Sequence, residues 1–197
     1  GPGDPCQNMG FETCDYTAWD LIQGRVDANP LGFINPVPTT LWGNGSVIGF
    51  GTPGDQHFMV GPGLDPNAPI QQVSPFGGGT CSAMLGDGNG AGYGASRITQ
   101  TFRVDATNAN FSYSYAAVLQ DPGTSHGLGD KPYFTVRMFD SGGTTIPCSE
   151  YTAISGDGQA GWVSTGTLEY KDWSIVVVPL QAYIGTDVTI EFTTGDC

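Results

Sequence analysis

The chain has few cationic side chains. Only 6 of its 197 residues are Lys or Arg, against 19 Asp and Glu, which gives a formal net charge of −13. A surface with this charge repels the phosphate backbone of nucleic acids and the head groups of anionic membranes. The sequence also lacks an apolar run near the roughly 20 residues that a membrane-spanning helix needs. We therefore expect neither nucleic-acid binding nor membrane insertion.

Cysteine and histidine are scarce too, and neither is arranged as a zinc site. With no CxxC pair and only two histidines, the five cysteines fit disulfides in an oxidising compartment better than metal ligation. An odd number leaves one thiol free or pairs it outside this segment. The chain starts without Met or a signal peptide and ends at Cys197. We expect residues 1–197 to form a single domain of a longer secreted polypeptide, with neighbouring domains among its partners.

Recognisable catalytic motifs are missing. Glycoside hydrolysis needs two carboxylates that face one cleft, yet the four glutamates are scattered, and Glu191 should simply face outward on its strand. A Ser/His/Asp arrangement would have to use His57 or His126, but no GxSxG elbow occurs and neither histidine has a plausible nucleophile beside it in sequence. We predict that the protein is not an enzyme.

Alternation of apolar and polar residues is the dominant pattern, and it is typical of strands with one buried face. In the first long run, for example, Ile98, Phe102 and Val104 share one face with Gln100. Alternation predicts long strands at residues 96–104, 110–119, 133–140 and 187–194, and shorter ones at 18–23, 47–50, 57–61, 82–86 and 161–169.

Residues 173–180, WSIVVVPL, are more continuously apolar than the other runs. We expect a strand covered on both faces that ends at Pro179, because proline cannot donate to the hydrogen-bond ladder. The 31 glycines and 14 prolines gather between the strands with Asp and Asn, as turn residues do. No helical period occurs apart from one possible turn within residues 179–185. The sequence predicts an all-β fold, a two-sheet antiparallel jelly-roll sandwich.

Three stretches resemble one group of jelly-roll domains, the carbohydrate-binding modules and MAM domains. NMGFE (8–12) is similar to an NGGFE opening, SAMLGDGNGAGYGASRITQTFRV (82–104) to the middle of these domains, and WSIVVVPLQAYIGTDVTIEFTT (173–194) to their W…V.LS.Y.G..V.I.F pattern. With NFSYSYAAVLQDPG and KPYFTVRMFD, the chain more narrowly resembles domains of large cell-surface adhesins of Bacteroidetes, the gliding-motility and type IX secreted class. The resemblance implies an extracellular, cell-surface location and a role in adhesion.

The same resemblance implies a disulfide pattern. In that family the domain usually continues with a final strand that ends in another cysteine, so Cys6 would pair beyond this segment. The remaining pairs would then be Cys148 with Cys197 and Cys14 with Cys81. The spacing alone does not decide this, because four cysteines already allow three pairings.

Calcium is the cofactor that the sequence favours, since hard cations bind several oxygen ligands from carboxylates and loop carbonyls. GDGNG at residues 86–90 supplies Asp87 and Asn89, although an ordinary tight turn also explains this motif. In the resembling sugar-binding modules the Glu of GFE commonly takes part in a structural calcium site. That role carries over here to Glu12.

Glycan binding needs exposed aromatic rings beside polar groups, because the C–H faces of a pyranose pack on a π face. Trp19 and Trp173 fall inside strand patterns and are interpreted as core. Three other rings lie in Gly-rich loops, and the long loop 121–132 offers two polar side chains at a rim. The predicted ligand-binding residues are Trp42, Tyr93, Trp162, His126 and Asp130.

Three functions fit these features. The first is a non-catalytic extracellular adhesion module that binds glycans or cell-surface molecules, with calcium as a structural ion. The second is a purely structural spacer or assembly domain of a giant surface adhesin or filament. The third is an accessory carbohydrate-binding module of a secreted polysaccharide-degrading enzyme. An exposed coplanar pair of aromatic rings in a groove would favour the first, and buried rings the second.

Overall fold

The computed structural model describes residues 1–25, 56–77, 79–86, 94–125 and 131–196. Almost all regular structure in this part of the chain is β-strand, with short 3₁₀ turns at Gly123–Ser125 and Gln181–Tyr183. The predicted strand at 47–50 lies outside the described residues. The strands are β1 (Asp20–Arg25), β2 (His57–Val60), β3 (Ser82–Leu85), β4 (Gly94–Arg103), β5 (Asn110–Gln120), β6 (Tyr133–Asp140), β7 (Tyr151–Ile154), β8 (Val163–Ser164), β9 (Leu168–Pro179) and β10 (Asp187–Gly195).

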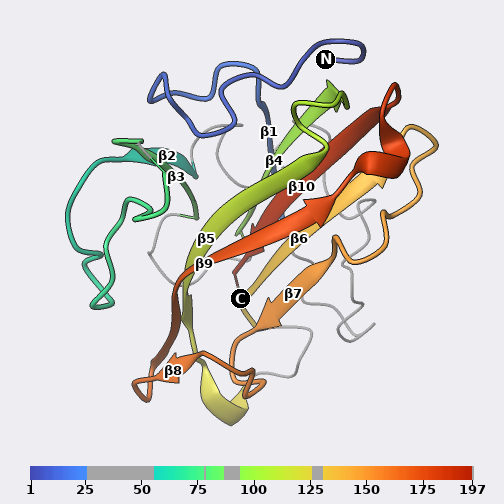
Figure 1. The fold of residues 1–197 in the computed structure, drawn as a ribbon. Helices are drawn as coiled ribbons and strands as arrows, with labels where there is room; N and C mark the ends of the chain where they lie inside the picture. Colours follow the sequence, from blue (N-terminus) through green and yellow to red (C-terminus); the bar gives the residue numbers. More distant parts are fainter. Residues whose placement is uncertain (26–55, 78, 87–93, 126–130, 197) are drawn as a thin grey trace.

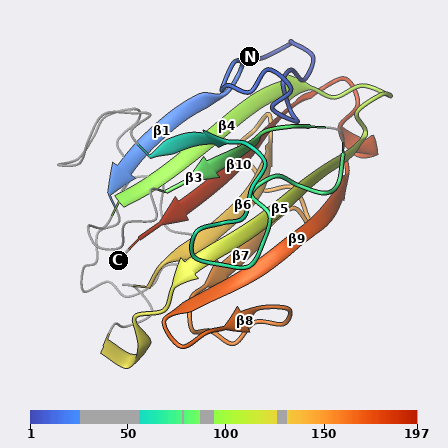
Figure 2. The ribbon, with the colours of Figure 1, turned by 90° about the vertical axis from the view of Figure 1, so that its left-hand side faces the viewer.

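Two antiparallel sheets pack face to face. A five-stranded sheet, in the order β1-β4-β10-β6-β7, lies behind a three-stranded sheet in the order β5-β9-β8 (Figures 1 and 2). β2 and β3 pair separately at one edge of the sandwich. The chain crosses from one sheet to the other between β4 and β5, β5 and β6, β7 and β8, and β9 and β10. The predicted all-β, antiparallel jelly-roll sandwich is confirmed.

The core lies between the sheets, where the alternation of the strands predicts it. In β5 the inward residues from Phe111 to Leu119 are buried while Asn110 and Ser112 are exposed. On the facing sheet Phe102, Met138 and Ile190 are fully buried, and the register places Met138 directly opposite Ile190. Burying a large apolar side chain contributes about 1.5–3 kcal/mol, so this layer dominates the stability of the sandwich.

Glu191 does not face solvent, contrary to the prediction from alternation. Glu191 is 6% exposed, and its Oε1 accepts hydrogen bonds from Arg137 Nη2 (2.6 Å) and Nε (3.2 Å). Arg97 Nη2 lies 3.4 Å from the same oxygen and Arg97 Nε donates to Thr193 Oγ1 at 2.9 Å. Arg137 is directly opposite Glu191 in the antiparallel register. Alternation shows which side chains share a face, but not whether that face is covered.

β9 also departs from the prediction. Its end at Pro179 is confirmed, but the strand is not covered on both faces. Val178 is fully buried, whereas Ile175 is 51% and Val177 60% exposed. The described residues therefore leave the outer face of β9 open at these positions, although the side chains on it are as apolar as those of the inner face.

The N-terminal segment is fastened across the edge of the sandwich. Cys14 and Cys81 form a disulfide, as predicted, which ties the segment to the residue before β3. Cys6 carries a free thiol. The predicted bridge from Cys148 to Cys197 is not formed, because Cys148 is a free, exposed thiol; Cys197 itself lies outside the described residues.

Aromatic side chains also hold the N-terminal segment against the sandwich. Trp19 is buried, as predicted, and stacks on Phe11 with ring centroids 5.3 Å apart. Tyr16 donates its hydroxyl to the carbonyl of Phe58 on β2 at 2.9 Å. Burial raises the pKa of Tyr16, so the hydroxyl keeps its proton. Within the described residues, no helix is long and apolar enough to cross a bilayer.

Candidate ligand-binding cleft

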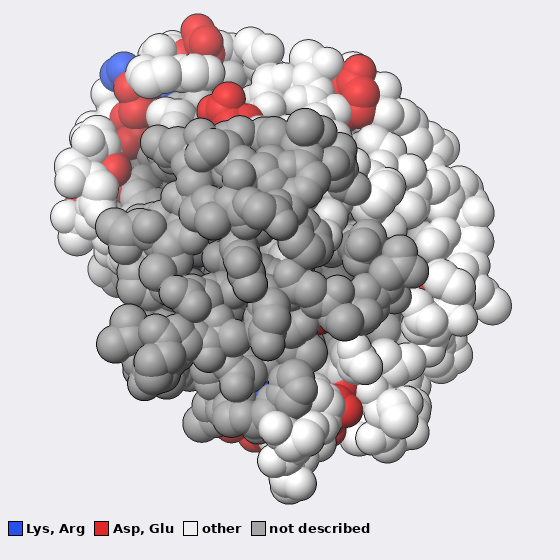
Figure 3. Space-filling model, turned by 180° about the vertical axis from the view of Figure 1, so that it is seen from behind, with Lys and Arg blue, Asp and Glu red and all other residues white. Residues whose placement is uncertain are grey.

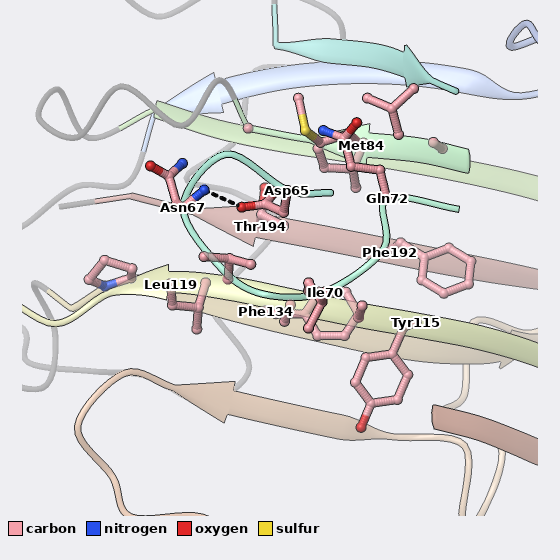
Figure 4. A pocket seen from close by; sticks show the side chains of 18 of the residues that line it. Asp65, Asn67, Ile70, Gln72, Met84, Tyr115, Leu119, Phe134, Phe192 and Thr194 are labelled. Atoms are coloured by element: carbon pink, nitrogen blue, oxygen red, sulfur yellow. Dashed lines mark hydrogen bonds between the residues drawn. The ribbon is translucent and has the colours of Figure 1, made fainter. Parts of the chain in front are cut away.

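A loop between β2 and β3 forms one side of an open cleft. Residues 63–72 of this loop, called the lip from here on, fold back so that Asp65 N–H donates to Ile70 O at 2.8 Å. Asp65 Oδ1 accepts the N–H groups of Asn67 (2.8 Å) and Ala68 (3.0 Å), which makes an Asx turn. Figure 4 shows the lip in front of the strands with Asp65 and Asn67 on it. Its conformation is therefore set by its own hydrogen bonds.

The lip is anchored on the three-stranded sheet. Trp173 Nε1 on β9 donates to the carbonyl of Gln71 at 2.7 Å. Just beyond the lip, Ser114 on β5 donates its hydroxyl to Ser74 Oγ at 2.9 Å. Trp173 is half-buried and lines the cleft, so its interpretation as a core residue was wrong. Two strands of one sheet thus hold the lip in place over the edge of the sandwich.

The cleft behind the lip has a volume of about 900 Å³. This lies within the range of roughly 300–1,000 Å³ that small-molecule sites occupy. Apolar side chains reach it from the lip, from β3 and from both sheets of the sandwich (Figure 4). The apolar lining includes Ile70, Met84, Ile98, Leu119, Phe134 and Phe192.

Amide and carboxylate side chains surround this apolar lining. Amides both donate and accept hydrogen bonds, and Asp65 and Asp196 add negative charge. Burial raises the pKa of Tyr115, so that ring also lines the cleft in its neutral form. No Lys, Arg or His is among the described residues of the lining. The polar residues of the cleft include Gln56, Asp65, Asn67, Gln72, Gln120, Thr194 and Asp196.

Trp162 is the one predicted ligand-binding residue that the structure describes, and it is not part of the cleft lining. It is half-buried next to β8, and its Nε1 donates to the hydroxyl of Tyr151 at 3.2 Å. The ring is therefore packed against β7 rather than presented in a groove. The other four predicted ligand-binding residues lie outside the described residues: Trp42, Tyr93, His126 and Asp130.

Glu12 is exposed, and its Oε1 accepts the N–H of Gly10 at 3.1 Å. In the described part of the chain, no group of three or more His, Cys, Asp or Glu gathers around it or elsewhere. Because calcium also binds carbonyl oxygens, the role of Glu12 stays a prediction. Asp87 and Asn89 lie outside the described residues, and calcium binding stays a prediction.

Sequence reasoning missed the lip. GPGLDPNAP, residues 61–69, was interpreted only as turn chemistry, which its Asx turn at Asp65 does confirm. One signal was available: Ile70 is an isolated apolar residue in a turn-rich loop, and such a residue indicates that the loop packs on the core. It is 6% exposed. Gln71 and Gln72, which follow Ile70, would then lie beside this buried residue, where they line the cleft.

No protein-family model and no curated protein matches this chain. Among solved structures, it is similar to the enzymatically active domain of tailspike protein 4 of bacteriophage CBA120, with a TM-score of 0.45 and 10% sequence identity. The match covers 98% of this chain and 19% of the tailspike chain. At this level of similarity the match carries no argument about function.

Proposed function

We propose that the protein is a non-catalytic extracellular adhesion module whose cleft binds a glycan. The supporting observation is the lining of the cleft, in which an apolar floor is surrounded by amide and carboxylate groups. A pyranose has the matching chemistry, since its C–H groups pack on apolar and aromatic surfaces while its hydroxyls bond to amides and carboxylates.

The anchored lip supports the same function. Because Trp173 and the Asx turn of Asp65 fix the lip before any ligand arrives, binding would not have to order this loop. The Cys14–Cys81 disulfide supports an extracellular location, because such bonds persist in oxidising compartments. Attachment to the cell surface is the further step that the resemblance to surface adhesins suggests.

A panel of immobilised glycans tests the proposal, with the double variant Asn67→Ala, Gln72→Ala as the probe of the cleft. Each amide hydrogen bond contributes about 1 kcal/mol net, so the double variant should bind roughly thirty-fold more weakly. Gln181→Ala is the matched control, because Gln181 is exposed and its amide bonds to Asn110. Absence of binding to every glycan by a folded sample would sink the proposal.

The structural spacer is the second candidate, and two observations favour it. Among the described residues, the aromatic pairs that stack are core pairs, such as Phe102 with Phe111, and no exposed coplanar pair occurs. Ile175 and Val177 also leave apolar surface on the outer face of β9. A spacer should show no glycan binding, and deleting its cleft amides should change nothing.

A further inference from the structure

We propose that the cleft takes an uncharged, methyl-bearing sugar, such as a 6-deoxyhexose or an N-acetylhexosamine, and rejects acidic sugars. This inference rests on the proposed glycan-binding function. It is carried by two properties of the cleft, the charge of its lining and the shortage of polar partners on its floor.

The charge of the lining is negative. Asp65 and Asp196 both line the cleft, and no described Lys or Arg does. On the back of the molecule, too, acidic groups are scattered over the described surface and little positive charge is visible (Figure 3). A carboxylate or sulfate in the cleft would lose water without gaining a cation, and it would lie near like charges.

Few other cations of the chain could pair with an acidic ligand in the cleft, because nearly all of its six Lys and Arg lie outside the cleft lining. Arg97 and Arg137 are buried against Glu191 on the outer face of the five-stranded sheet. The remaining described cations are Arg103, 2.7 Å from Asp187, Lys131, 3.9 Å from Asp121, and Lys171 on β9. Arg25 is the one cation whose side chain the structure does not describe. A single arginine could pair with only one of the two carboxylates of the lining.

The floor of the cleft favours methyl groups. Leu119 and Phe192 offer no hydrogen bond, so a hydroxymethyl group placed against them leaves its hydroxyl without a partner. A methyl group in the same place buries the same carbon without leaving a hydroxyl unpaired, which is worth at least about five-fold in affinity. The amides of Asn67 and Gln72 lie at the polar margin, where ring hydroxyls or the amide of an N-acetyl group can bond to them.

A matched series of sugars that differ only at C6 tests this inference. The probes are 6-deoxyglucoside, glucoside and glucuronide, with the corresponding galactose series, each as a multivalent conjugate. We expect the methyl compound to bind at least about five-fold more tightly than the hydroxymethyl compound, because the hydroxyl of the latter must be desolvated without a partner. The uronide should bind roughly ten-fold more weakly than the hydroxymethyl compound, because its carboxylate and the carboxylates of the lining repel each other as unit charges several ångströms apart near a protein surface.

Asp65→Asn separates charge from conformation. Asparagine keeps the Oδ1 acceptor and hence the Asx turn to Asn67 and Ala68, but it removes one negative charge. In this variant the ratio of uronide affinity to the affinity for the uncharged sugars should rise several-fold. A rise for all three sugars alike would refute the charge argument.

The outcomes distinguish the two proposals. Binding in the order methyl, hydroxymethyl, carboxylate supports the inference. A uronide that binds as tightly as its parent sugar, or a glycan panel on which only acidic glycans bind, overturns the inference and leaves the glycan-binding function standing. If no sugar in either series and no glycan on the panel binds to the folded protein, the proposed function itself fails.

Discussion

Replacing Glu191 with glutamine should destabilise the sandwich strongly. Glutamine keeps the size of the side chain and one acceptor oxygen, but it removes the negative charge that faces Arg137 and Arg97. The side chains of Arg137 and Glu191 are each 7% exposed and that of Arg97 is 5% exposed. Water therefore cannot take over the role of the lost charge.

The magnitude follows from this burial. Breaking a buried ion pair by removing one partner costs about 3–5 kcal/mol, and the retained oxygen places Glu191→Gln near 3 kcal/mol. For a domain of this length the melting temperature falls by roughly 2–4 °C per kcal/mol, so the expected loss is about 6–12 °C. Arg97 has its own bond to Thr193, which keeps part of the cluster in place.

Urea denaturation at neutral pH measures the effect, with Glu150→Gln as the control. Glu150 is exposed, so the same chemical change there should alter the free energy of unfolding by less than about 0.5 kcal/mol. Combining Arg137→Met with Glu191→Met should recover part of the loss, because only Arg97 then remains of the two buried cations that face Glu191. If Glu191→Gln proves as mild as Glu150→Gln, the interpretation of this cluster as a buried, coupled ion pair is wrong.

Two further predictions concern the frame of the domain. Replacing Cys14 and Cys81 with serine opens a link between residues 67 apart in sequence and should cost about 4 kcal/mol; an unchanged urea midpoint under non-reducing conditions would contradict it. His57 is buried, and desolvation lowers its pKa below 6.5. Since the unfolded chain then binds the proton more readily, stability is lost as the pH falls below about 6.5. The urea midpoint of wild type should drop more between pH 7 and 5 than that of His57→Gln, and parallel pH profiles would refute this.

The sequence predicted the strands well because alternation is a local property. The runs 110–119, 133–140 and 187–194 agree with β5, β6 and β10 to within one residue at either end. What covers each face is a tertiary property, and the failures lie there. Alternation predicted that Glu191 is exposed, and the apolar run around Val177 predicted that this residue is covered. In the structure Glu191 is buried and Val177 is exposed.

The candidate site could not be predicted in the same way. Its lining comes from segments far apart in sequence, including the lip, β3, β5, β6 and β10. The aromatic residues in Gly-rich loops were chosen because a ring there can stay exposed, but Trp162 shows that such a ring can also pack: its indole N–H is bonded to Tyr151. Trp173, by contrast, sits in a strand and still lines the cleft.

The scarcity of cations connects the stability of the domain with the selectivity that we propose for its cleft. Arg103 with Asp187 joins β4 to β10, and Lys131 with Asp121 joins the start of β6 to the end of β5. Arg97 and Arg137 reach Glu191 from the two strands that flank β10. Arg103 and Lys131 could turn to an acidic ligand only by leaving Asp187 or Asp121, and Arg97 and Arg137 are buried with Glu191. The preference for uncharged ligands that we propose would thus follow from how the sandwich uses its positive charge, as well as from the aspartates of the cleft.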